Sequence, residues 1–120
     1  MGTHRRDETK PYLLLDDVFA PYLANGVLQV FELQAMSESL AQRIEVESGR
    51  VLGPHIFVAA MIDGSLSSWS IGSTRVATTP ENGRQAVRDV AAEGYDMIKV
   101  YSRSAIMRID VYALRRGRRR

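Results

Sequence analysis

The segment His55–Met61, with the sequence HIFVAAM, constrains the fold most strongly. It is apolar at nearly every position, and the turn-forming pair Gly53-Pro54 comes directly before it. A strand with one wet face alternates apolar and polar residues, whereas an unbroken apolar run is typical of a strand buried on both faces. Such strands occur mostly in parallel sheets, whose strands need long crossover connections. The segment therefore predicts an α/β fold.

Two further strands are predicted on either side of this segment. Residues 27–33 (VLQVFEL) and 97–101 (MIKVY) are rich in β-branched and aromatic residues. Helical patterns separate the three strands, and this alternation indicates right-handed βαβ units and a parallel sheet. Periodicity alone does not distinguish an open doubly wound sheet from part of a barrel. Residues 63–78, with two glycines and several serines, predict a long loop after the second strand.

Helix boundaries are marked most clearly around Thr79-Pro80-Glu81, which combines an N-cap, a proline at the first helical position and an acid in the first turn. Gly94 predicts the end of that helix. An earlier helix is expected to have Ser37 as its N-cap and to end at Gly49. Its expected buried face consists of Leu40, Ala41 and Ile44.

The two ends of the chain give weaker patterns. Asp16 or Asp17 is expected to cap a short helix that reaches about Ala24, and Pro21 fits that helix only near its first turn. The Asn25-Gly26 pair then predicts its end. The apolar residues of 104–114 fit neither period cleanly, and we expect a poorly formed helix there.

Composition is that of a globular protein. The 120 residues are 45% hydrophobic and 25% charged, enough for one domain. No apolar run approaches the roughly 20 residues that span a membrane, and the N-terminus lacks the apolar core of a secretory signal, so no membrane partner is expected. Without cysteine there is no disulfide framework, and the cytoplasm is the expected location.

Basic residues are concentrated at the C-terminus. The segment Arg115–Arg120 holds five of the 16 basic residues, and the remaining 11 face 14 acidic residues, which gives the rest of the chain a net charge of −3. We interpret the tail as a solvated end and do not expect nucleic acid as a partner. The alternative is that the tail attracts phosphates or acidic surfaces.

Four strings together resemble the amidohydrolase superfamily. They are ANGV at 24–27, SGRVLGPHI at 48–56, TPE at 79–81 and GYDMIKVY at 94–101. Within the superfamily their order and spacing are similar to the imidazolonepropionase-like and prolidase-like (Xaa-Pro dipeptidase-like) branch. The resemblance covers residues 12–102. It divides the chain into 1–11, disordered or a remnant of strand one; 12–102, a partial barrel; and 103–120, a poorly ordered helix with the arginine-rich tail.

The resemblance implies a partial TIM-type (β/α)8 barrel of about three parallel strands with intervening helices. In the whole family, one or two zinc-type divalent metals lie at the C-terminal ends of the strands. A metal-activated water attacks the amide-type carbonyl of a small amide or dipeptide-like substrate, whose C–N bond is then hydrolysed. The family's metal ligands are a His-x-His pair on strand one, a carbamylated lysine on strand four, histidines on strands five and six, and an aspartate on strand eight.

The resemblance carries over to few residues. Lys99 in IKVY matches the lysine of strand four, which carbamylation converts into a carboxylate-like metal bridge. His4 matches the second histidine of the strand-one pair, with Gly2 in place of the first. Glu32 takes the place of the aspartate that usually ends strand two, and Asp63 ends the third strand. We therefore expect Glu32 and Asp63 at the same edge of the sheet as Lys99.

Two functions follow from this comparison. In the first, the chain is a fragment or truncated member of an amidohydrolase that hydrolyses C–N bonds; alone it is inactive and binds no metal, because most ligands are missing. No catalytic residue is assigned, and the sequence contains no G-x-S-x-G, H-E-x-x-H, Walker A or G-x-G-x-x-G motif. The alternative is a non-catalytic, self-associating α/β protein whose basic tail binds nucleic acid or acidic partners. Under either function, an interrupted barrel leaves unpaired strand edges, so we expect a homo-oligomer or association with the rest of a barrel.

Overall fold

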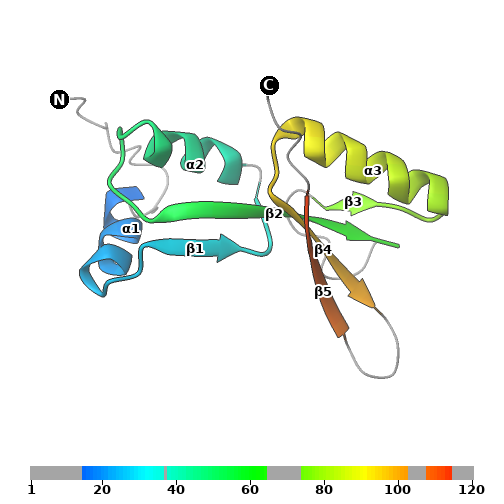
Figure 1. The fold of residues 1–120 in the computed structure, drawn as a ribbon, viewed down its shortest axis with the longest axis horizontal. Helices are drawn as coiled ribbons and strands as arrows, with labels where there is room; N and C mark the ends of the chain where they lie inside the picture. Colours follow the sequence, from blue (N-terminus) through cyan, green and yellow to red (C-terminus); the bar gives the residue numbers. More distant parts are fainter. Residues whose placement is uncertain (1–14, 37, 65–73, 103–107, 115–120) are drawn as a thin grey trace, which may run out of the picture.

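The structure is a computed structural model that describes residues 15–36, 38–64, 74–102 and 108–114. Helices and strands alternate through most of this part, as predicted (Figure 1). The elements are α1 (Leu15–Ala24), β1 (Gln29–Glu32), α2 (Ser39–Glu47), β2 (His55–Asp63), β3 (Arg75–Val76), α3 (Pro80–Glu93), β4 (Met97–Ser102) and β5 (Arg108–Ala113).

The long strand β2 organises the sheet. β1 pairs in parallel with its first half, from Gln29 opposite His55 to Glu32 opposite Val58. β4 pairs in parallel with its second half, Ala59 to Ile62. The three predicted parallel strands are thus confirmed, within a mixed, mostly parallel five-stranded sheet. Because the two partners are staggered along β2, the sheet curls like half of a barrel (Figure 1).

A short strand lies in the segment predicted as a loop. β3 pairs in parallel with the end of β2, where Arg75 is opposite Ile62 and Val76 is opposite Asp63. Ile62 is also opposite Val100 of β4, so β3 and β4 occupy opposite edges of β2. The end of β2 is therefore paired on both sides, which suits its apolar sequence.

The prediction of a helix over residues 104–114 is wrong. Residues 108–113 form β5, which pairs antiparallel with the whole of β4, from Met97 opposite Ala113 to Ser102 opposite Arg108. The outer edge of β4 presents backbone N–H and C=O groups that need partners, and β5 satisfies them. A segment with weak helical periodicity and several β-branched residues gains more from this pairing than from a solitary helix.

The sheet has two different faces. Successive residues of a strand alternate between faces, and residues paired across strands share one. The registers place Val30, Ile56, Val58, Ala60 and Ile98 on what we call the helix face, because α2 and α3 lie on that side (Figure 1). The core there consists of Phe19, Ala35, Val51, Ile56, Val58, Ala60, Val90 and Tyr95.

The ends of α3 agree with the sequence prediction. Thr79 is the N-cap, and its Oγ1 accepts a hydrogen bond of 3.2 Å from the Asn82 amide, with Pro80 at the start of the helix. Gly94 ends the helix with φ +96°, a left-handed conformation that glycine adopts without steric cost. The buried residues of α3 are Ala86 and Val90, which lie one turn apart on the same side of the helix.

Helix α2 differs from the prediction in its start and in its buried face. It begins at Ser39 with Glu38 as an N-cap that makes no side-chain capping bond, while Ser37 lies outside the described residues. The buried residues are Ser39 and Arg43. Of the expected face, Leu40 is partly buried against the core, whereas Ala41 is exposed and Ile44 is 53% exposed. Hydrophobic spacing predicts only part of the buried face, because polar contacts of Ser39 and Arg43 also decide which side of the helix is buried.

Pro21 was expected near the first turn of α1 but is the seventh of its ten residues. The proline ring removes one helical hydrogen bond, and the helix ends within one turn of it. Asn25 closes that end: its side-chain Nδ2 donates to the Pro21 carbonyl at 2.7 Å, and its backbone N–H also points to that carbonyl. Gly26 follows with φ +76°, so the predicted helix stop is confirmed.

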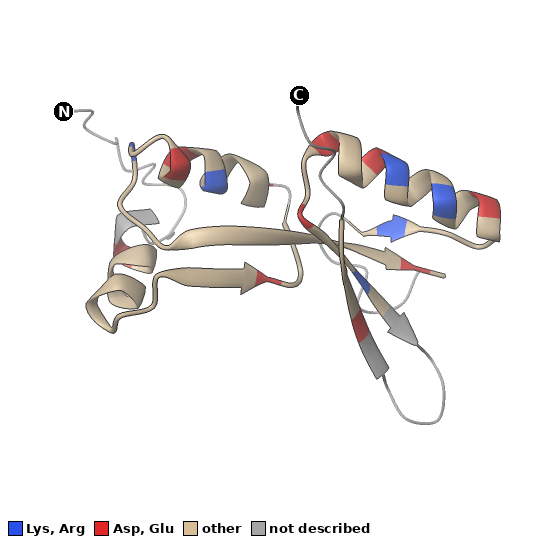
Figure 2. Ribbon diagram, viewed as in Figure 1, with Lys and Arg blue, Asp and Glu red and all other residues tan. Residues whose placement is uncertain are grey.

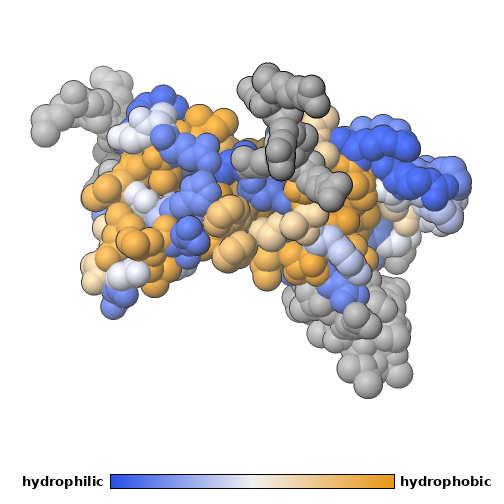
Figure 3. Space-filling view, viewed as in Figure 1, coloured by the Kyte–Doolittle hydropathy of each residue, from blue (hydrophilic) through white to orange (hydrophobic). Residues whose placement is uncertain are grey.

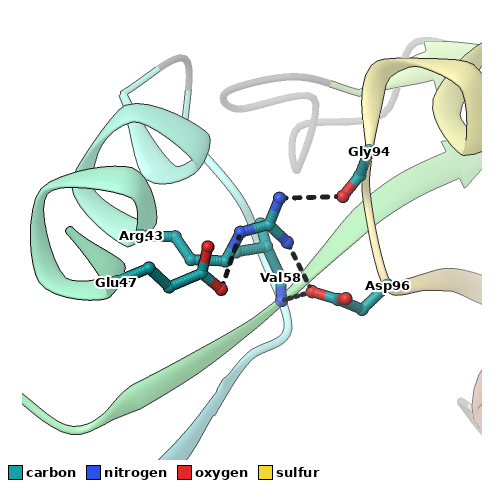
Figure 4. Close-up of polar contacts among 5 residues, drawn as sticks. All are labelled: Arg43, Glu47, Val58, Gly94 and Asp96. Carbon is teal, nitrogen blue, oxygen red and sulfur yellow. Dashed lines mark hydrogen bonds and ion pairs between the residues drawn. The ribbon is translucent and has the colours of Figure 1, made fainter.

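Arg43 joins α2 to the turn between α3 and β4 (Figure 4). Its Nη1 donates to Asp96 Oδ2 at 2.7 Å and its Nη2 donates to the Gly94 carbonyl at 2.9 Å. The Nε atom lies 3.8 Å from Glu47 Oε1, which is close enough for an ion pair but too far for a hydrogen bond. Asp96 Oδ2 also accepts from the Val58 amide at 3.0 Å. The Arg43 and Asp96 side chains are 11% and 9% exposed, so solvent screens this pair weakly.

The first prediction concerns this ion pair. Replacing Arg43 with Met leaves the Asp96 carboxylate buried without its cation, and we expect the free energy of unfolding in urea to fall by about 3 kcal/mol. Arg84→Met is the matched control, because the Arg84 side chain is 59% exposed in its pair with Glu81 and such pairs contribute little. Equal, small losses for the two variants would contradict the role given to Arg43.

Candidate functional site

Lys99 and Asp63 lie on the face of the sheet opposite the helix face. Lys99 pairs with Met61, and Asp63 follows Met61 by two positions, so the three side chains share this face. Two positions along a strand correspond to about 7 Å. Lys99 and Asp63 are 6% and 7% exposed, which places an amine and a carboxyl group in a buried setting.

The position of Lys99 within its strand differs from expectation. It is the third residue of β4, which continues to Ser102, and not the end of the strand. In the direction across the sheet it lies between Met61 of β2 and Val111 of β5. Both of its cross-strand partners are apolar, and Asp63 lies further along the same face.

Glu32 was expected at the same edge of the sheet as Lys99 and Asp63, but the register of β1 places it elsewhere. It pairs with Val58, five positions before Asp63 on β2, or about 17 Å along the strand. Because Val58 is on the helix face, Glu32 is on that face too. The staggered pairing of β1 with the first half of β2 is the cause, since the ends of parallel strands meet only when the strands end at the same level.

Glu32 instead organises the connection from β1 to α2. Its Oε1 accepts a hydrogen bond of 2.7 Å from Ser39 Oγ. Ser39 Oγ in turn accepts from the Met36 amide at 2.8 Å, and Ser39 is only 2% exposed. The carboxylate is therefore part of a local network that fixes the first turn of α2.

The two histidines do not extend the site within the described residues. His55 is the exposed first residue of β2, at the opposite end of that strand from Asp63. Its ring packs edge-on against Phe57, with centroids 4.5 Å apart and an interplanar angle of 81°. His4, matched by resemblance to a metal ligand, lies outside the described residues.

The sequence prediction missed an aromatic row on the same face as Lys99. Phe31 of β1 stacks on Phe57 of β2 with ring centroids 4.9 Å apart and an interplanar angle of 14°. His55 continues the row along β2. Aligning the alternate residues of the two predicted strands would have found the pair, but only with the register known.

The described residues do not by themselves fit a metal ion. Among them, no group of three or more His, Cys, Asp or Glu side chains is placed to hold one. Lys99 and Asp63 are two groups, and a catalytic zinc site usually has three protein ligands and a water. We therefore derive no chemical step through a metal.

Charges on the surface are mixed. Along α3 the acidic and basic side chains are interleaved (Figure 2), and Arg75 of β3 pairs with Glu93 at 2.7 Å. Near the end of α2, hydrogen bonding and charge attraction from Glu45 raise the pKa of Arg50 above its ordinary value. This shift only reinforces a charge already present at neutral pH.

Comparison of the chain with protein-family models, characterised proteins and solved structures gives no match. Within the described ranges, no helix is both long and apolar enough to cross a membrane.

The second prediction tests the structural role of Glu32. Glu32→Ala removes the acceptor for Ser39 Oγ and should lower the free energy of unfolding by about 1 kcal/mol. Glu32→Gln keeps an acceptor oxygen and should lose less. In a double-mutant cycle with Ser39→Ala, the two losses should not add, because both changes break the same bond. Additive losses would mean that Glu32 acts elsewhere.

Proposed function

We propose that this chain contributes a segment of a metal-dependent amidohydrolase barrel that hydrolyses C–N bonds, and that it is inactive alone. The supporting observation is the placement of Lys99. It is buried on the face of a curled, mostly parallel sheet that lies opposite the helix face. In a (β/α)8 barrel the helices cover the outside, so this face corresponds to the barrel interior.

Asp63 adds weight to this proposal. It shares the face with Lys99 and ends β2, one of the two strands that flank β4. Oxygen ligands such as a carboxylate and a lysine carbamate suit hard or borderline divalent ions. The other ligands would have to come from outside the described residues, and the substrate class is a small amide or an Xaa-Pro dipeptide. The absence of cysteine favours a cytoplasmic location for such an enzyme.

The third prediction is that the purified 120-residue chain has negligible hydrolase activity. Lys99 with Asp63 falls short of a metal site, so added zinc, cobalt or manganese should not produce hydrolysis of amide or Xaa-Pro dipeptide substrates. The measurement is amine release over time, with and without a chelator. Robust, chelator-sensitive turnover by the pure chain would contradict the proposal that it is inactive alone.

The coding sequence on both sides of this segment, read in all frames, tests the lineage. We expect a His-x-His pair upstream and further histidines downstream. The product of the longer reading frame, supplied with ¹³C-bicarbonate and zinc, should show a carbamate carbon by NMR. Lys10 and Lys99 are the two lysines of the sequence, so the signal should vanish in Lys99→Gln and persist in the matched control Lys10→Gln. Metal-free product, or a signal that survives Lys99→Gln, would refute the proposal.

Self-association is the second candidate, and the exposure of β1 favours it. Phe31 is 59% exposed although it lies within a strand. The tail at 115–120, which the alternative function assigns to acidic partners, lies outside the described residues.

A further inference from the structure

The outer edge of β1 has free backbone groups in a defined pattern. β1 is the first strand in the order of the sheet, and no described strand pairs with its other side (Figure 1). The His55 amide donates to the Leu28 carbonyl at 2.9 Å. In a parallel ladder this bond fixes the alternation: the backbone groups of Val30 and Glu32 face β2, and those of Gln29 and Phe31 face outward.

The side chains at this edge do nothing to block pairing. Proteins protect exposed strand edges with lysine, proline or bulges, and residues 28–31 (LQVF) contain none of the first two. Leu28 and Phe31 are 67% and 59% exposed, and large apolar patches, interrupted by polar ones, lie over the region of β1 and α1 in Figure 3. The carboxylate of Glu32 is engaged by Ser39 on the helix face. The edge is therefore mostly apolar, and its one acid, Glu32, already accepts a hydrogen bond from Ser39.

We propose that this edge pairs with the β1 edge of a second copy, forming an antiparallel dimer with Phe31 on the two-fold axis. A two-fold axis perpendicular to the sheet keeps each face on its own side, so Phe31 meets the partner's Phe31. Because the Phe31 backbone groups point outward, the two residues exchange a pair of N–H to O=C hydrogen bonds. Val30 then lies opposite the partner's Glu32, and no like charges face each other.

The aromatic row explains why this register is preferred. Adjacent strands are about 4.7–4.9 Å apart. The Phe31 and Phe57 rings already stack with centroids 4.9 Å apart, the same repeat. A second copy across the axis continues the stack to four rings, which covers the exposed side of Phe31. Centring the axis on Val30 would place Gln29 against the partner's Phe31 and lose that stacking.

The dimer should be weak. β1 has four residues, and an interface this short falls at the small end of the range for specific complexes. We expect a dissociation constant in the micromolar range, so that dilution separates the copies. This inference rests on the self-association candidate and applies to the isolated 120-residue chain, because in a complete barrel the strand before β1 would occupy the same edge. Its test measures association, and the hydrolase proposal is tested by activity and by the carbamate signal, so the two can fail separately.

The fourth prediction is tested by size-exclusion chromatography with light scattering over a series of protein concentrations. The wild type should shift from monomer to dimer. Phe31→Lys should remain a monomer at every concentration, since an edge lysine must be desolvated to pair. Ile44→Lys and Tyr112→Lys are matched controls, with side chains 53% and 54% exposed on α2 and on the other edge strand, β5. Both should still dimerise.

Two results would overturn the proposal: a wild-type monomer throughout, or a dimer that survives Phe31→Lys, as it would if only Tyr112→Lys abolished it. Hydrogen exchange on the wild type checks the register without a mutation. The Gln29 and Phe31 amides should become protected as concentration rises, while the Val30 amide, directed at β2, should be protected throughout. Unchanged exchange at Phe31 between monomer and dimer would likewise rule out pairing through β1.

Discussion

Asp96 lies where three parts of the structure meet. Its carboxylate accepts from Arg43 of α2 and from the Val58 amide of β2, while its own amide donates to the Val58 carbonyl at 2.9 Å. Val58 is the last residue of β2 that pairs with β1, and Ala59 is the first that pairs with β4. The aspartate therefore supplies both hydrogen bonds at the point where β2 changes partners. Without this contact, α2 and β4 would be joined mainly by the apolar core between them.

The sequence predicted elements whose determinants are local. Thr79-Pro80, Gly94 and Gly49 mark helix ends through conformations that depend on one or two residues, and the structure agrees. The apolar run of β2 identified a central strand for a similar reason. The same reasoning failed for α2 and β5, whose structure depends on long-range contacts. The buried side of α2 is set by Arg43 reaching Asp96, 53 residues away, and β5 forms because β4 offers an edge. Neither partner is visible in a short sequence window.

The candidate site shows the same contrast between local and long-range determinants. The sequence supplied the identity of Lys99 and Asp63, and the register of β2 with β4 brings them to one face. It misplaced Glu32 because strand order was taken to imply a common strand end. β1 stops five positions short of the end of β2, and the alternation of side chains sends its last carboxylate to the helix face. Register, which depends on backbone pairing between distant segments, is the quantity that a single sequence leaves undetermined.

The hydrogen bonds between Asp96 and Val58 also determine to which face of the sheet each side chain of β4 points. Side chains in a strand alternate with a period of two, so sliding β4 by one residue against β2 would exchange its two faces. Asp96 precedes Lys99 by three positions, and its double attachment to Val58 allows one alignment of the segment that follows. In that alignment the lysine amine is directed away from the helices. The carboxylate that binds Arg43 of α2 thus decides on which side of the sheet the amine of Lys99 is displayed.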